Sequence, residues 1–320
     1  MRGPSGRVLA LLAALASAGQ LPVGAQSAQR LAADCATAGG DGTLCALSAA
    51  AGRDLMGDIG VLAGLGSDVP GQSSILGSRL GGTPRFAVSM RVSGYSVVVP
   101  DLADATGRAE RSPWVPGVHA GLALGLFDGF MLLPTVGGLF SLDLFSQGSF
   151  LFFSEEDGFD GRVDGVSVGA RVGLIRESFT LPGVTLAVSR RLLGTLRLGD
   201  VGGGDPAQVV VDPSVTSVRV TVGKDLFAFG VHGGAGWDDY SSRTTVQATD
   251  GAGGYSSASA SLGETRSLYF VGLSRQLGIL TWISAEVGWQ KGFDPVVLGA
   301  TTSSERGWTA VGSLALLVKL

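Results

Sequence analysis

Several residue types are scarce in this chain, and each shortage removes a class of function. Lysine and arginine number 23 among 320 residues and the net charge is −4, so the sequence offers no basic surface for nucleic acid. There are two histidines and two cysteines, and neither histidine lies near a cysteine, so we predict no metal site and no cofactor. Charged residues make up only 16% of the chain, which argues against extensive disorder.

Long apolar runs are missing after the first 25 residues. No later segment has the roughly 18 consecutive apolar residues that a membrane-spanning helix requires, although the mean hydropathy is +0.35. At the start of the chain, Arg2 and Arg7 accompany the short apolar run 8–18, and small residues follow at 23–25. We therefore predict a secretory signal peptide over residues 1–25 and a mature chain that begins near Gln26.

Instead of long runs, the chain has a repeated alternation of apolar residues with small or polar ones. In one such segment Phe86, Val88 and Met90 alternate with Ala87 and Ser89, and ten comparable segments follow one another between residue 85 and the end of the chain. Alternation with a period of two is the pattern of a β-strand with one apolar face. The off-stripe positions are mostly glycine, alanine and serine, the side chains that a crowded interior needs.

The connections between these segments alternate strictly in length. Short connections lie near 127–130, 176–182, 223–225 and 274–278, and long ones near 99–116, 146–163, 197–214, 238–264 and 291–306. Within the first short connection, Asp128-Gly129 favours a tight hairpin turn. Ten strands with short turns at one end and long loops at the other resemble a bacterial outer-membrane β-barrel, and the resemblance covers residues 85–320.

This resemblance implies an all-β, transmembrane, antiparallel up-and-down barrel with both ends of the chain in the periplasm and the long loops outside the cell. It also implies contact with outer-membrane lipid and lipopolysaccharide, and insertion by the barrel-assembly machinery. The last residue, Leu320, departs from the aromatic residue usual at the end of this class. Two alternatives stay open at this point. Twelve strands would result if 243–261 formed an extra hairpin, and a secreted β-sandwich would turn the same apolar faces inward.

Residues 26–84 form a separate N-terminal segment, which we expect either in the periplasm or inside the barrel as a plug. Cys35 and Cys45 are expected to form a disulfide, because an exported chain matures in an oxidising compartment. A short helix should follow, since apolar residues recur at helical spacing. These residues are Leu47, Ala51, Leu55, Ile59 and Leu62. Residues 64–84 are rich in glycine, serine and proline, and we predict irregular structure there.

Polar residues at the positions that alternate with the apolar ones, and that therefore face into the barrel, form the candidate site. We predict that the lumen is lined by Arg91, His119, Asp143, Arg171, Arg219, His232 and Glu286. Opposite charges in a narrow barrel are expected to pair with one another, because an unpaired buried charge is costly. The parity pattern alone leaves a second arrangement open, in which the same residues line a wet channel.

Two strings resemble hydrolase motifs, but their context argues against an enzyme. Residues 165–169 fit the G-x-S-x-G nucleophile elbow around Ser167, and residues 232–236 resemble a glycine-rich oxyanion string. The elbow requires a sharp strand-to-helix turn, whereas Ser167 lies inside an alternating run. Asp238 and Asp239 lie near His232, as in ten-stranded outer-membrane aspartyl proteases, but the Asp-x-His and Asp-x-Asp spacings of those proteases are absent. We predict no catalytic residues and no enzymatic activity.

Two functions remain as hypotheses for a barrel of this kind. The first is a narrow or plugged channel that passes an unknown small or hydrophobic solute, because about ten strands leave an interior close to filled by side chains. The second is a structural or surface-binding barrel that uses its long loops as a contact surface. The sequence names neither the solute nor the binding partner.

Overall fold

The computed structural model describes residues 24–64, 66–77, 84–104, 110–131, 138–226, 229–292, 297–298, 301–302 and 308–320. Residues 1–23 of the expected signal peptide lie outside this described part. Ten antiparallel strands form a closed barrel, in which β15 pairs with β1 and β9 pairs with β10. The strands are β1 (Arg85–Ser96), β4 (Trp114–Phe127), β5 (Ser141–Phe152), β6 (Arg162–Ile175), β7 (Gly183–Leu193), β9 (Ala207–Leu226), β10 (Phe229–Thr249), β11 (Tyr255–Gln276), β12 (Thr281–Lys291) and β15 (Trp308–Lys319).

The predicted ten-stranded barrel is therefore confirmed, and the twelve-stranded and sandwich alternatives are wrong. Shorter elements lie within the long connections at one end of the barrel. They are β2 (Val99–Pro100) paired with β3 (Glu110–Arg111), the 3-10 turn η1 (Glu155–Asp157), β8 (Leu196–Leu198) paired with β9, and β13 (Val297–Leu298) paired with β14 (Thr301–Thr302).

The region predicted as a long loop at 238–264 is instead a continuous hairpin. Strands β10 and β11 stay paired up to Thr249 and Tyr255, and only residues 250–254 form the tip. Beyond Leu268, strand β11 has no partner in β12, so its outer part extends for about 40 Å at the usual rise per residue. The sequence here alternates serine or threonine with small residues, a pattern with too little hydrophobic contrast to signal a strand.

The predicted tight turn at Asp128-Gly129 is also wrong. Strand β4 ends at Phe127 and β5 begins at Ser141, and an isolated bridge between Phe130 and Leu139 closes the base of the longer connection between them. Gly129 adopts a left-handed conformation with φ of 79°, so the glycine redirects the chain without closing the hairpin.

The outward faces of the strands show where the membrane lies. On β10, the outward side chains of Phe229, Val231 and Trp237 are exposed and apolar, whereas outward positions beyond Trp237 are polar residues such as Ser241 and Arg243. On β11 the same change occurs at Tyr269. An apolar band that ends at aromatic residues is the lipid-facing surface of a membrane barrel. The outer parts of β9, β10 and β11 therefore project from the membrane into water.

The N-terminal segment contains two helices, α2 (Gly24–Thr37) and α3 (Gly42–Gly64), joined by the predicted disulfide between Cys35 and Cys45. Helix α3 is longer than the short helix predicted from the apolar spacing. It begins near Asp41, whose Oδ1 accepts hydrogen bonds from the backbone N–H groups of Thr43 at 2.9 Å and Leu44 at 3.0 Å. These bonds satisfy donors that the first turn of a helix leaves unpaired.

No helix in the described part of the chain combines the length and apolarity needed to span a bilayer.

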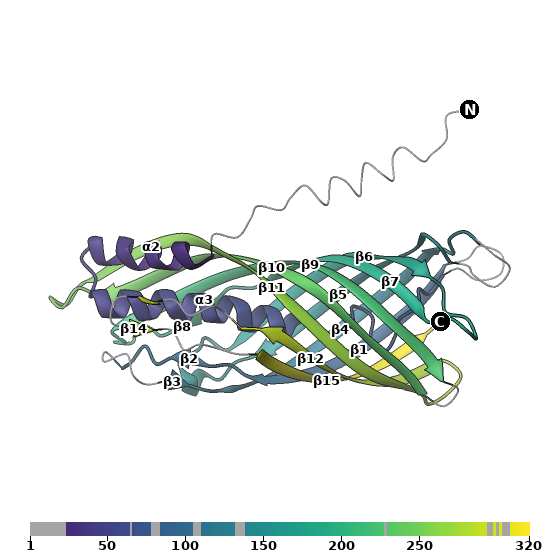
Figure 1. The fold of residues 1–320 in the computed structure, drawn as a ribbon. Helices are drawn as coiled ribbons and strands as arrows, with labels where there is room; N and C mark the ends of the chain where they lie inside the picture. Colours follow the sequence, from purple (N-terminus) through teal and green to yellow (C-terminus); the bar gives the residue numbers. More distant parts are fainter. Residues whose placement is uncertain are drawn as a thin grey trace.

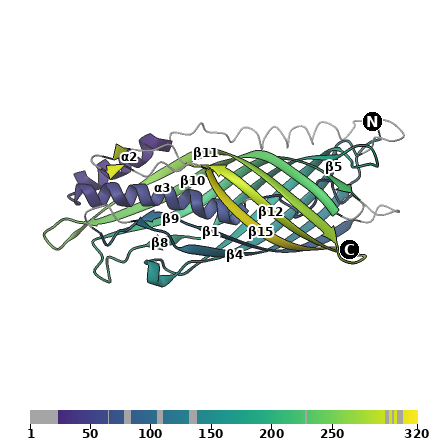
Figure 2. The same ribbon diagram turned by 60° about the horizontal axis from the view of Figure 1, so that its bottom comes forward.

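The two helices occupy different positions relative to the barrel. Helix α3 runs along the barrel axis inside the wall, and its first turns lie at the end that carries the long connections (Figures 1 and 2). Helix α2 lies beside α3 and packs on the inner face of the β10–β11 extension, where Ser256 donates a hydrogen bond to the carbonyl of Ala38 at 2.8 Å. The chain leaves α3, continues through residues 66–77, and reaches β1 at the opposite end, where β15 also ends (Figure 1).

Candidate functional site: the plugged lumen

Helix α3 fills the half of the lumen at the end that carries the long connections, which we call the outer half, by apolar packing. Its residues from Leu44 to Ala63 are all buried, and most of its apolar side chains share one cluster with those of α2 and the outer wall. Glycine lets the helix approach the wall closely. A Cβ atom at Gly60 would overlap the ring of Tyr240, and one at Gly52 would come within 3.1 Å of Val209 Cγ2. The wall and the helix are therefore matched in shape at these positions.

Polar contacts also join α3 to the wall inside this apolar region. Arg53 Nη2 lies 2.9 Å from Glu264 Oε2, and both side chains are largely buried. Arg191 Nη1 donates to the carbonyl of Gly60 at 3.0 Å, and Gln147 Nε2 donates to the carbonyl of Ala63 at 3.1 Å. The carbonyl of Ala63, which the end of the helix leaves without an intrahelical donor, thus receives one from the wall.

Below α3, the inner half of the lumen is crossed by an irregular segment, residues 66–77, which we call the strap. Glu286 on β12 holds its first part. The carboxylate accepts hydrogen bonds from the backbone N–H of Ser67 at 3.0 Å, from the Ser67 hydroxyl, and from the backbone N–H of Gly71 at 3.2 Å. It also lies 2.8 Å from His232 Nε2 and 3.3 Å from Arg91 Nη2. Glu286 is therefore the main junction between the strap and the wall.

Asp143 on β5 holds the other end of the strap. Its Oδ2 atom accepts hydrogen bonds from the backbone N–H of Leu76 at 2.9 Å and from Arg171 Nη2 at 2.6 Å. Arg171 in turn lies 3.4 Å from the carbonyl of Gln72. Asp143 and Arg171 face each other directly in the register of β5 and β6, so the sheet itself sets this pair.

A third cluster lies where α3 meets the strap. Arg219 Nη1 donates to the carbonyl of Gly66 at 2.6 Å and lies 3.9 Å from Asp68 Oδ1. Asp238 Oδ1 is 3.0 Å from Arg191 Nη2 and 3.3 Å from Arg219 Nη2. The carboxylate is fully buried, and the two guanidinium groups compensate its charge.

The structure places all seven predicted site residues in buried positions on the lumen side of the wall. Six of them join the three clusters that hold the plug, and His119 differs. Its ring nitrogens lie 2.9 Å from Ser93 Oγ and 2.9 Å from Ser149 Oγ, which are both wall residues.

Sequence reasoning missed several members of these clusters. Arg191 lies two residues after Ser189 in β7 and faces inward like it, so extending the alternation of this strand by two residues predicts its position. Asp238 lies six residues after His232 on β10, so it faces the same side of the strand. The partners on the strap are mostly backbone N–H and C=O groups, which no side-chain pattern reveals.

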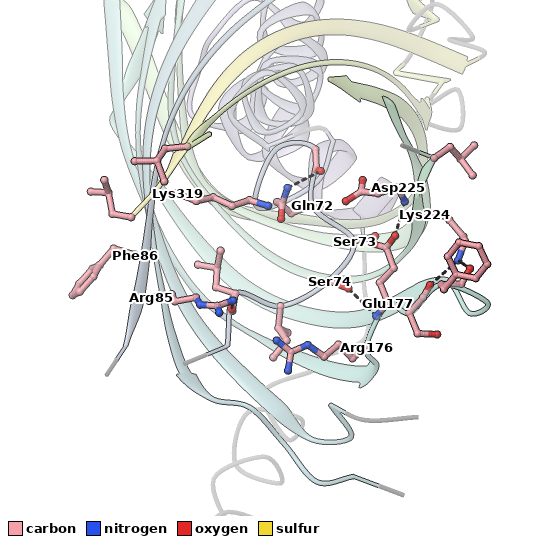
Figure 3. A pocket seen from close by; sticks show the side chains of 18 residues that line it. Gln72, Ser73, Ser74, Arg85, Phe86, Arg176, Glu177, Lys224, Asp225 and Lys319 are labelled. Carbon is pink, nitrogen blue, oxygen red and sulfur yellow. Dashed lines mark hydrogen bonds between the residues drawn. The ribbon is translucent and has the colours of Figure 1, made fainter. Parts of the chain in front are cut away.

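A cavity of about 950 Å³ lies at the inner mouth of the barrel, and the strap forms part of its wall. Gln72, Ser73 and Ser74 face it from the strap, with Arg85 and Lys319 on one side and Glu177 on another (Figure 3). Burial raises the pKa of the Glu177 carboxyl, which lies in the turn before β7 and accepts the backbone N–H of Asp225 at 2.5 Å. The strap therefore borders this cavity at the end of the barrel that carries the short turns.

The hydrolase-like strings do not form catalytic arrangements. Ser167 lies inside β6, which continues as a strand to Ile175, so the turn that a nucleophile elbow requires is absent there. Asp238 is paired with two arginines, and His232 with Glu286, so both groups belong to the plug contacts. Within the described ranges, no group of three or more histidine, cysteine, aspartate or glutamate side chains is arranged to hold a metal ion.

No family model matches the chain, and no curated protein matches it. Among solved structures, the translocator domain of the autotransporter NalP from Neisseria meningitidis is 12% identical, covers 73% of this chain and 88% of its own, and has a TM-score of 0.43. The outer-membrane protease OmpT from Escherichia coli is 9% identical, with coverages of 78% and 100% and a TM-score of 0.39. Ail, the attachment invasion locus protein of Yersinia pestis, is 10% identical, with coverages of 74% and 99% and a TM-score of 0.28.

These likenesses are too weak to carry a function. The closed ten-stranded barrel and its outward apolar band themselves identify an outer-membrane β-barrel protein, located in the bacterial outer membrane.

Proposed function

We propose that the protein is a gated outer-membrane channel for a small solute, closed at rest by its own N-terminal segment. The observation that carries this proposal is the unequal attachment of the plug. Helix α3 shares a large apolar cluster with the wall, whereas the strap contributes only Val69 and Leu76 to a small one and is held mainly by Glu286, Asp143 and Arg219. Polar contacts can be exchanged for water when a segment moves, so the strap is the part suited to opening.

The inner cavity supports the same proposal. It brings the periplasmic solution against residues 71–76 of the strap, so a displaced strap has space to enter. Displacement opens the inner half of the lumen and removes the contacts below the end of α3, and conduction then requires α3 itself to shift within the outer half. The proposal involves no chemical step and assigns no catalytic residue.

Single-channel recording in planar bilayers tests this gate. The wild-type protein should stay closed for most of the time and open briefly. Glu286→Ala removes three hydrogen bonds to the strap, so the open fraction should rise about tenfold, the effect of roughly 1.4 kcal/mol. His119→Ala is the matched control, because it alters a buried wall residue whose partners are Ser93 and Ser149. A folded Glu286→Ala barrel that opens no more often than the wild type would contradict the gate.

A surface-binding barrel is the second candidate, and the β10–β11 extension is the observation that favours it. This hairpin and α2 project beyond the apolar band and display serine and threonine side chains outward. If binding is the function, shortening the hairpin by removing 245–259 should abolish adhesion of whole cells to an extracellular-matrix surface. Both Glu286→Ala and the wild type should then be electrically silent, which separates this candidate from the channel.

A further inference from the structure

Four wall arginines follow one another along the plug, and each donates to one of its backbone carbonyl oxygens. Arg191 binds the carbonyl of Gly60, Arg219 that of Gly66, Arg91 that of Ser67 at 2.5 Å, and Arg171 reaches that of Gln72. In chain order the acceptors descend from the last turn of α3 through the strap. The wall therefore presents a ladder of guanidinium groups whose present ligands are oxygen atoms of the plug.

The charges of this ladder do not cancel within the wall. The four arginines are paired there with three carboxylates, Glu286, Asp143 and Asp238. The plug supplies a further carboxylate, Asp68, beside Arg219. When the strap leaves, it takes Asp68 and three of the four carbonyl oxygens with it, and only Arg191 keeps its acceptor, which lies on α3. The ladder then keeps one more positive charge than its three wall carboxylates balance, and three of its arginines have N–H donors that have lost their carbonyl acceptors.

The residues around the cavity at the inner mouth also carry a net positive charge. Among the residues that line the cavity, Arg85, Arg176, Lys224 and Lys319 are cationic, and Glu177 and Asp225 are anionic (Figure 3). An anion entering from the periplasm therefore meets a positive vestibule before it reaches Arg171. Fields of this kind raise the local concentration of the opposite charge.

We infer that the opened lumen conducts small anions, above all those with carboxylate or phosphate oxygens, which replace the plug carbonyls on the arginine ladder. This inference rests on the proposed gate and names its solute class. Guanidinium groups bind such oxygens in a forked geometry, and rings of arginine or lysine are the usual basis of anion selectivity in pores. The wall carboxylates hold the arginines in place and prevent a single anion from binding too tightly to leave.

The test is the ion selectivity of a variant whose strap is released without altering the wall. Residues 66–76 are replaced by a glycine–serine sequence of equal length, which removes Asp68 and the strap's fixed conformation. Reversal potentials are measured in a potassium chloride gradient, and phosphate is then added from the inner side. We expect severalfold preference for chloride over potassium, and phosphate should reduce the chloride current.

Arg171→Gln with Arg219→Gln in the same background should abolish the preference, whereas Arg243→Gln, an exposed arginine on the outward face of β10, should leave it unchanged. Preference for potassium, or a chloride preference insensitive to the lumen arginines, would overturn the anion inference and leave the gate intact. A folded strap variant that carries no current would overturn both. If the replacement prevents folding, the brief openings of the wild type supply the same reversal potential, and their absence likewise overturns both.

Discussion

The two halves of the plug are attached to the same barrel by different kinds of interaction, apolar packing in one and polar contacts in the other. In the outer half, α3 buries Leu47, Leu55, Met56 and Ile59 against apolar wall residues, and its glycines fit closely against the wall. In the inner half, the strap is irregular and depends on charged side chains that bind its backbone. Apolar packing is lost over its whole area when an element moves, whereas hydrogen bonds can be remade with water. One plug therefore combines a tightly packed element with one that is held by exchangeable polar contacts.

The largest effect should follow from a clash in the outer half. Gly60→Leu places a side chain where the Tyr240 ring already lies, so α3 must shift or the wall must deform. We expect a loss of as much as roughly 3 kcal/mol in the free energy of unfolding, the upper range for overpacking. Denaturant titration, with gel mobility of the unboiled protein as the readout, measures this loss.

Gly42→Leu is the control for this substitution, because open space surrounds Gly42 within 4 Å. It adds the same side chain at the other end of the same helix and should leave the unfolding free energy nearly unchanged. Equal losses in the two variants would mean that the fit between α3 and the wall does not set stability in the outer half.

A somewhat smaller effect should follow from removing the disulfide. Cys35→Ser with Cys45→Ser frees α2 from α3 and should cost about 2–3 kcal/mol by the chain-entropy model for a short loop. Hydrogen exchange should accelerate in α2, while the open fraction of the channel stays at the wild-type value. Because the disulfide lies in the outer half, a change in gating would show that the two halves are coupled.

The sequence predicted the membrane part of the barrel well, because lipid on one side and a crowded lumen on the other impose a strict period of two. It failed in the β10–β11 extension, where water replaces lipid and Ser257, Ser259 and Ser261 face outward. There the residues on both faces of the strands are small or polar, so the sequence shows no alternation of apolar with polar residues. Helix α2 was missed for a related reason, since Ala28, Leu31 and Cys35 make only a narrow apolar stripe.

The candidate site was predictable on the wall and unpredictable on the plug. Parity indicates which wall residues face inward, and it gave Asp143 and Arg171 without revealing that they face each other across β5 and β6. Their strap partners are the backbone N–H of Leu76 and the carbonyl of Gln72, which every residue type possesses. Which of these groups meets a wall charge depends on the path of an irregular segment, and that path follows from three-dimensional packing.

The smallest expected loss of stability comes from the inner half and gives the sharpest contrast between the two halves. Ser67→Ala removes the hydroxyl that donates to Glu286 but leaves that carboxylate its two backbone N–H donors, so it should cost about 1.5 kcal/mol. Hydrogen exchange should accelerate at residues 66–77 while the amides of α3 keep their wild-type protection, because apolar packing retains the helix. Ser149→Ala, which alters a wall residue near His119, is the control and should leave the exchange of the strap unchanged. If α3 exchanged faster together with the strap, the plug would open as one body, and the division into a tightly packed part and a readily released part would be wrong.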